Sequence, residues 1–430
     1  MGLGWLAILR LGLVQMALGS VVVLTTSTLN RLMVVELALP AILPGLLVGW
    51  HYAVQISRPS WGLMSDRGGR RTRWIIGGMS ALAGGATAAS LGVVLFATHP
   101  TLALAVSVLA YGMIGMGVGA ARTSLLALLA GAVAPHRRAA AATITWLMMI
   151  AGIALTAGGV GAILDPYSPA RLMRIVLAVC TGAVLVSVLA LWGIERAAPP
   201  PHPGSDGQGH LIAGLREIWA EPQARHFTIF VFLSMCAYFM QELILEPYAG
   251  LVFAFTPGQS TALGGAQHLG VFLGMLGVGI AATGLRLGSL RSWVVLGCTG
   301  SAASLLLIAL LGNLPQPGPL VPAVVLLGLF NGIFAVAAIG SMMALAGEGR
   351  SRREGTRMGL WGAAQAVAAG FGGLAGAAAV DLMRRVLAAD APAFATVFLV
   401  EAALFLAAAL LALRVIGAGA APRVAIMAGE

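Results

Sequence analysis

The sequence predicts an all-α integral membrane protein with twelve transmembrane helices in two six-helix halves. Of its 430 residues, 59% are hydrophobic and 9% are charged, which leaves too little polar surface to cover a soluble globule. The mean hydropathy is +0.94, and apolar stretches long enough to cross a bilayer recur along the chain. Because backbone polar groups must be hydrogen-bonded within the bilayer, we expect these stretches to be helical.

Six expected spans precede a polar linker and six follow it. The first set covers residues 6–28, 37–55, 74–98, 102–132, 141–164 and 175–192. The second set covers residues 227–244, 262–285, 293–311, 321–346, 358–380 and 393–413. The linker, 195–225, is rich in proline and glycine. We therefore expect an N-terminal half at 1–194 and a C-terminal half at 226–430, an outline typical of duplicated transporters.

Charge predicts the orientation of these spans and excludes two classes of function. All 25 basic residues are arginine, which excludes chemistry that needs a lysine Schiff base. The formal charge is +10, but 18 arginines fall on one side of the expected spans and five on the other. This bias predicts cytoplasmic termini and a cytoplasmic linker in a bacterial inner membrane. It accounts for the charge without nucleic acid as a partner.

Cysteine usage predicts packing rather than chemistry. Cys180, Cys236 and Cys298 are isolated in apolar stretches, without a CxxC motif or a histidine at metal-ligand spacing. We expect no directly bound metal ion.

The segment between the second and third spans carries a recognisable motif. Residues 62–71 read GLMSDRGGRR, which fits the major-facilitator loop signature GxxxDRxGRR. The residues that define it are Gly62, Asp66, Arg67, Gly69, Arg70 and Arg71. We expect a conformational latch in which the Asp66 carboxylate accepts from backbone N–H groups at a helix N-terminus, while the glycines allow a tight turn. The alternative, a loop that only sets topology, does not explain the aspartate.

Other segments resemble one branch of that superfamily. They are RLGLVQ at 10–15, TLNRLMVVEL at 28–37, QELILEPY at 241–248, NGIFAVA at 331–337 and EGTRMGLWGAAQ at 354–365. Together they are similar to the PucC/LhaA-type family, the light-harvesting complex assembly proteins of photosynthetic bacteria. The resemblance implies a major-facilitator fold and a non-enzymatic protein of the photosynthetic membrane. It also implies bacteriochlorophyll as a bound ligand, and light-harvesting polypeptides or a reaction-centre antenna complex as partners.

Histidines at membrane depth are candidates for binding the pigment. A neutral imidazole is a suitable axial ligand for the magnesium of a bacteriochlorin. His268, which follows Gln267 in a glycine-rich helix, is the first candidate, and His51, one turn before Gln55, is the second. The alternative is a histidine hydrogen-bonded within the helix bundle.

Further polar residues are candidates for proton coupling. Glu242 and Glu246 are four residues apart, so both carboxylates share one helix face. They are either a proton-coupling pair or structural groups that pair with Arg31 or cap loop amides near Pro247, where we expect the helix to end. Asn30 and Arg31 follow the first span, and Arg122 lies within the fourth, where it is expected to face the bundle interior.

Three functions remain open from the sequence. The first is an antenna assembly factor that binds or delivers bacteriochlorophyll. The alternative is a proton-coupled major-facilitator transporter of a small molecule. A prenyl transferase is disfavoured, because it needs clustered aspartates to hold magnesium diphosphate and the aspartates here are scattered over loops.

Overall fold

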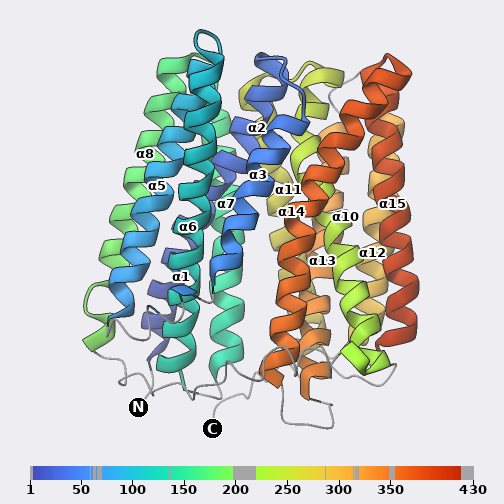
Figure 1. Ribbon diagram of the computed structural model, residues 1–430. Coiled ribbons are helices and arrows are strands. Elements are labelled where there is room, and N and C mark those ends of the chain that lie inside the picture. Colours follow the sequence, from blue (N-terminus) through green and yellow to red (C-terminus); the bar gives the residue numbers. More distant parts are fainter. Residues whose placement is uncertain are drawn as a thin grey trace. The chain divides into compact units, whose positions relative to one another are not determined.

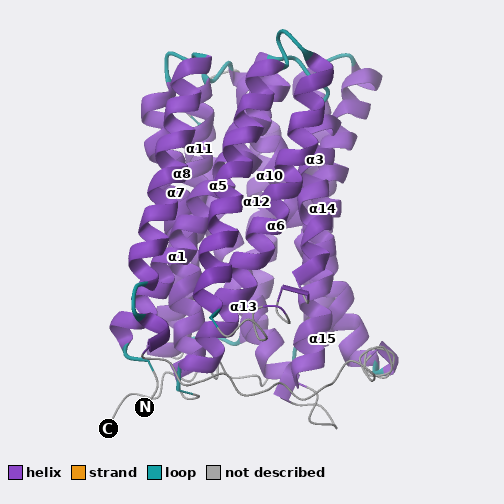
Figure 2. Ribbon diagram, turned by 60° about the vertical axis from the view of Figure 1, so that its left-hand side comes forward, coloured by secondary structure: helices purple, strands orange, loops and turns teal. Residues whose placement is uncertain are grey.

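The computed structural model describes residues 3–58, 60–61, 64, 70–134, 137–196, 219–285, 287–312, 314, 319–347 and 354–417. Every regular element in these ranges is a helix, and none is a strand (Figure 2). Eleven helices of the described part are long and apolar enough to cross a membrane. The predicted all-α, multi-pass architecture is confirmed.

The packing divides the chain into two compact units. The first unit contains α1 (Trp5–Val23), α2 (Leu29–Arg31), α3 (Ile42–Val54), α5 (Arg71–Leu95), α6 (Pro100–Ala132), α7 (Arg138–Leu164) and α8 (Pro169–Leu191) (Figure 1). Leu245–His268, a segment that lies later in the sequence, also belongs to it. Two π-helical turns, Leu24–Thr28 and Leu32–Glu36, join α1 and α2 into one continuous helix from Trp5 to Glu36.

After α8, the described residues form six further α-helices. They are α10 (Pro222–Phe253), α11 (Pro257–Gly279), α12 (Leu290–Leu311), α13 (Leu320–Gly347), α14 (Glu354–Leu387) and α15 (Asp390–Val415). The end of α10 and the start of α11 lie in Leu245–His268 and so belong to the first unit, while the remainder forms the second. The two six-helix halves expected from the linker stay a prediction, and most of that linker lies outside the described residues.

Three helix boundaries differ from the sequence-based expectation. The first helix continues through Asn30 and Arg31 to Glu36, because both of these polar side chains are buried there instead of ending the span. The second expected span, 37–55, begins later, with α3 at Ile42, and the helical turn Gln55–Ser57 directly follows α3. The expectation that Pro247 ends its helix is wrong, since α10 continues through it to Phe253.

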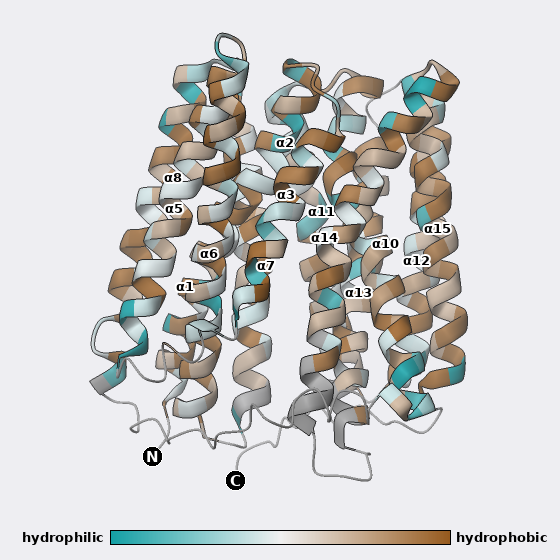
Figure 3. Ribbon diagram, in the orientation of Figure 1, coloured by the Kyte–Doolittle hydropathy of each residue, from teal (hydrophilic) through white to brown (hydrophobic). Residues whose placement is uncertain are grey.

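Glycine sets how closely the helices pack. A Cβ atom on Gly78 of α5 would lie 2.6 Å from the backbone nitrogen of Ala121 on α6, so a larger residue cannot fit there. In the second unit, a Cβ on Gly372 would lie 2.7 Å from the carbonyl oxygen of Cys236. Large apolar side chains such as Leu189 and Leu410 are exposed, as expected for helices in lipid. Hydrophobic residues predominate along the helices (Figure 3).

Candidate functional site

A polar cluster lies inside the first unit, where the Trp5–Glu36 helix meets the segment that joins α10 to α11. The helix reaches this point through its two π-helical turns, on either side of Asn30 and Arg31. Such turns shift the register of the side chains and are frequent at functional sites. Asn30 and Arg31 are 1% and 2% exposed.

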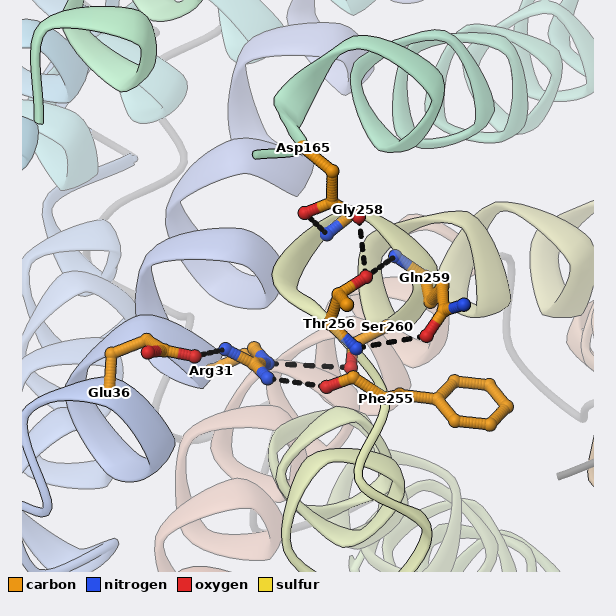
Figure 4. Close-up of polar contacts among 8 residues, drawn as sticks. All are labelled: Arg31, Glu36, Asp165, Phe255, Thr256, Gly258, Gln259 and Ser260. Carbon is orange, nitrogen blue, oxygen red and sulfur yellow. Dashed lines mark hydrogen bonds and ion pairs between the residues drawn. The ribbon is translucent and has the colours of Figure 1, made fainter. Parts of the chain in front are cut away.

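Arg31 is the centre of this cluster (Figure 4). Its guanidinium forms an ion pair with Glu36 at 2.5 Å and donates to the Phe255 carbonyl oxygen at 2.7 Å and the Ser260 hydroxyl at 3.3 Å. Gly250 of α10 leaves room for it, since a Cβ there would lie 3.1 Å from one guanidinium nitrogen. Three acceptors satisfy this buried cation, and two of them, Phe255 and Ser260, flank the start of α11, so Arg31 fastens the start of α11 to the Trp5–Glu36 helix.

Asp165, just after α7, contacts the start of α11 close to the residues that bind Arg31 (Figure 4). Its carboxylate accepts from the Thr256 hydroxyl and, at 3.0 Å, from the backbone N–H of Gly258. Gly258 is in the first turn of α11, where unsatisfied N–H groups favour an anion. Nearby, burial and then the negative charge of Glu36 raise the pKa of Tyr167, which lies between α7 and α8.

Glu246 lies in the first unit, on the last turns of α10. It is 3% exposed and accepts a hydrogen bond from Ser27 of the first π-helical turn. Its second carboxylate oxygen has no hydrogen-bond partner among the described residues. A Cβ on Gly264 of α11 would collide with the first oxygen, so this glycine is what admits the carboxyl group. Glu242 falls in the second unit, so the proposed coupling pair stays a prediction.

His268 is held in one tautomer by its own helix. Its Nδ1 lies 2.9 Å from the Gly264 carbonyl oxygen. A carbonyl oxygen only accepts, so Nδ1 carries the proton and Nε2 keeps its lone pair. A metal-binding histidine has this same arrangement, with one nitrogen oriented by a backbone acceptor and the other free to coordinate. The imidazole therefore fits the magnesium of a bacteriochlorin. The adjacent Gln267 side chain is buried.

His51 is in a different situation. It is 2% exposed, and its Nε2 lies 2.8 Å from Nε2 of Gln55, which donates to it. The lone pair that a metal would need is thus already in use, and this geometry favours the structural alternative for His51. Gln55 in turn accepts from Arg58.

The remaining predicted site residues are only partly described. Gly62, Asp66, Arg67 and Gly69 of the expected latch lie outside the described residues. Arg70 immediately precedes α5, and Arg71 donates to the Ala127 carbonyl oxygen at 2.6 Å, which fastens the start of α5 to α6.

The Arg122 guanidinium lies over the Trp146 ring, 5.5 Å from its centroid, between α6 and α7. Arg122 is half-buried at this position, and its expected orientation toward the bundle interior stays a prediction.

Sequence reasoning missed most of the cluster around Arg31. Glu36, Asp165, Ser260 and Ser27 were not among the candidates, because each is an ordinary residue near the end of an apolar stretch. The one available signal was the pair Arg31 and Glu36, two opposite charges five residues apart in an otherwise apolar run.

Known proteins of similar structure establish the fold. The peptide transporter POT, solved in complex with sulfate, superimposes with a TM-score of 0.72 at 14% identity over 96% of both chains. A bacterial homologue of the human lysosomal transporter Spinster gives a TM-score of 0.64 at 14% identity over 95% of both chains. The predicted major-facilitator fold is confirmed.

Similarity in sequence is more specific. A Rhodobacter capsulatus protein named Bacteriochlorophyll synthase 44.5 kDa chain is 65% identical over 431 residues, which is 100% of both chains. Protein PucC of Cereibacter sphaeroides is 28% identical over 386 residues, 84% of this chain and 81% of that protein. The family model described as PUCC protein matches residues 28–420. This chain is therefore a member of the PUCC protein family.

Proposed function

We propose that this chain is an assembly factor for light-harvesting antenna complexes, which binds bacteriochlorophyll and delivers it to antenna polypeptides. The observation that carries this proposal is the full-length, 65% identical relative whose name contains bacteriochlorophyll synthase, in a family that includes the PucC proteins. The protein would lie in the photosynthetic inner membrane. Both of its termini would be in the cytoplasm, as the arginine distribution predicts.

His268 is the residue that we propose to hold the pigment. The magnesium of a bacteriochlorin would supply an open coordination position, and the chain would contribute Nε2 of His268. The hydrogen bond from Nδ1 to the Gly264 carbonyl oxygen orients the ring and increases its basicity. Gln267 and His51 are secondary candidates at most, since His51 already accepts from Gln55.

We propose a role without catalysis, even though the 65% identical relative is named as a synthase chain. The support is the transporter fold and the PucC relatives. Such a chain would assist a synthase by binding pigment rather than by catalysing its formation.

The second candidate is a proton-coupled carrier of a small molecule. The buried carboxyl of Glu246, whose second oxygen has no partner among the described residues, supports it. The Arg31 contacts would then hold one state of the rocking bundle, and Glu242, Asn30 and Arg122 would be further polar positions along the pathway.

Deletion of the gene separates the two functions. An assembly factor predicts loss of antenna absorption in membranes of the deletion strain, restored by the wild-type gene, with unchanged solute flux in vesicles. A carrier predicts uptake or efflux that depends on the proton gradient and disappears with the gene. Normal antenna absorption in the deletion strain would rule out the assembly role.

A further inference from the structure

Two arginines of the first unit lie close together, away from the cluster around Arg31. Arg58 follows the helical turn Gln55–Ser57 at the end of α3, and its Cγ lies 3.9 Å from where a Cβ on Gly119 of α6 would be. Arg122 is three residues further along α6, on the same face of that helix. The two positive charges are near enough to repel one another.

Among the described residues, the contacts of this arginine pair are aromatic and polar, and none of those recorded is acidic. The Arg122 guanidinium lies against Trp146, and Tyr52 is close enough to interact electrostatically with both arginines. Arg58 donates to the Gln55 side chain, while its buried Nε has no hydrogen-bond partner among the described residues. One N–H of the Arg58 fork is therefore available to a ligand.

The described acidic residues of the first unit are engaged elsewhere. Asp165 accepts from the Gly258 N–H of α11, and Glu246 accepts from the Ser27 hydroxyl. Glu36 pairs with Arg31, and Glu195 accepts from the Thr72 backbone N–H at 3.1 Å. In the part of the chain that the structure describes, no ion pair joins Arg58 or Arg122 to a carboxylate. Two like charges in a partly buried place are costly without a compensating anion.

We propose that Arg58 and Arg122 form a binding site for the anionic group, carboxylate or phosphate, of an otherwise apolar molecule. Guanidinium forks bind both groups with paired charge-assisted hydrogen bonds. Ten residues separate Arg122 from the end of α6 at Ala132, about 15 Å along the helix. This depth along α6 suits the anionic group of a lipid or of a tetrapyrrole with a free propionate.

This site does not depend on the proposed function. It uses α3, α6 and α7, whereas His268 is on α11. If His268 does not bind pigment, the proposed site at Arg58 and Arg122 is unaffected.

Thermal unfolding of the full-length protein in mild detergent tests the proposal. The probes are dihexanoyl phosphatidylglycerol against dihexanoyl phosphatidylcholine, and protoporphyrin IX against its dimethyl ester. We expect at least one anionic probe to raise the unfolding midpoint, with no effect of its neutral or zwitterionic counterpart. Arg58→Gln and Arg122→Gln should each lower the affinity of the protein for the anionic probe roughly tenfold or more, because each variant loses a charge-assisted contact.

A matched control separates this site from general arginine chemistry. Arg137 lies over the Trp5 ring at 5.2 Å, the same pairing as Arg122 with Trp146. Arg137→Gln should leave the probe effect intact, and Arg122→Lys, which keeps the charge without the fork, should give an intermediate effect. The lysine variant also keeps the test decisive if a glutamine variant does not fold.

The probes that raise the unfolding midpoint identify the class of ligand. A response to phosphatidylglycerol alone identifies a lipid headgroup, a response to the porphyrin acid alone identifies a tetrapyrrole, and a response to both identifies a site for the shared anionic group. The proposal is overturned if no anionic probe raises the midpoint, or if the rise persists unchanged in the folded Arg58 and Arg122 variants.

Discussion

Arg31 and the pair Arg58 with Arg122 are arginines in the interior of the same unit, and their surroundings differ in one respect. Arg31 has a carboxylate, a backbone carbonyl and a hydroxyl around it (Figure 4). In the described part of the chain, the recorded contacts of Arg58 and Arg122 are with an amide, two aromatic rings and each other. A buried charge that the protein itself satisfies contributes to structure, whereas one that it leaves uncompensated is suited to a ligand.

The largest effect is expected at Arg31. Arg31→Gln removes three contacts and leaves the buried Phe255 carbonyl oxygen without its donor. We expect a loss of roughly 2–4 kcal/mol in the free energy of unfolding, because breaking a buried pair leaves polar groups unsatisfied. Chemical denaturation in detergent, followed by tryptophan fluorescence, measures it.

Glu36→Gln is the control for Arg31→Gln. The Glu36 side chain is 37% exposed, so water replaces part of what it loses, and the change should cost less than about 1 kcal/mol. Equal losses in the two variants would show that the ion pair, rather than the contacts to Phe255 and Ser260, carries the stability.

The next largest effect is expected at Gly264. Gly264→Ala brings a methyl group against the Glu246 carboxyl and should cost about 1–3 kcal/mol through overpacking. Gly277→Ala, in the same helix, meets open space and should be neutral or stabilising by up to about 1 kcal/mol. Comparable denaturation curves for the two variants would mean that Glu246 moves aside freely and is not fixed against Ser27.

A smaller effect is expected at Asp165. Asp165→Ala removes the acceptor for the Gly258 N–H and the negative charge at the start of α11, with a cost of about 1 kcal/mol. Thr256→Val removes the hydroxyl that donates to that carboxylate and accepts from the Gln259 backbone N–H, but it keeps the negative charge of Asp165 and should cost less. If Thr256→Val is the more damaging of the two in thermal unfolding, the threonine rather than Asp165 caps the helix.

The smallest effect on stability is expected at Arg122. Arg122→Gln loses a cation–π contact but also removes repulsion with Arg58, so in the absence of an anion the free energy of unfolding should change by about 0.5 kcal/mol or less. A loss as large as that at Arg31 would contradict the distinction between the two places and make Arg122 structural.

Hydropathy alone was sufficient to predict the helices. The fold class followed from apolar stretches of spanning length, and Gly78 and Gly372 show why glycine is so abundant between helices. The boundaries near Arg31 and Pro247 were wrong because tertiary contacts override local signals. Arg31 stays in its helix since Phe255 and Ser260 accept from it, and these residues are more than two hundred positions away in the sequence.

The site was predictable only in part for the same reason. His268 and Glu246 could be named as candidates because a polar residue at membrane depth is conspicuous in the sequence. Their partners, Gly264 and Ser27, are a glycine and a serine like many others in the chain, and only packing selects them. The tautomer of His268 and the occupied lone pair of His51 likewise depend on geometry that spacing does not specify.

The most direct measurement is an absorption spectrum of the protein purified from photosynthetic membranes in mild detergent. We predict a bacteriochlorophyll band in the wild type and a lower ratio of pigment to protein in His268→Leu at equal yield. His51→Leu should lower this ratio less. His99→Leu, at an exposed position where the ring is hydrogen-bonded to Thr98, should leave the ratio unchanged. A wild type without pigment would contradict bacteriochlorophyll binding itself, and an unchanged ratio in His268→Leu would contradict His268 as its ligand.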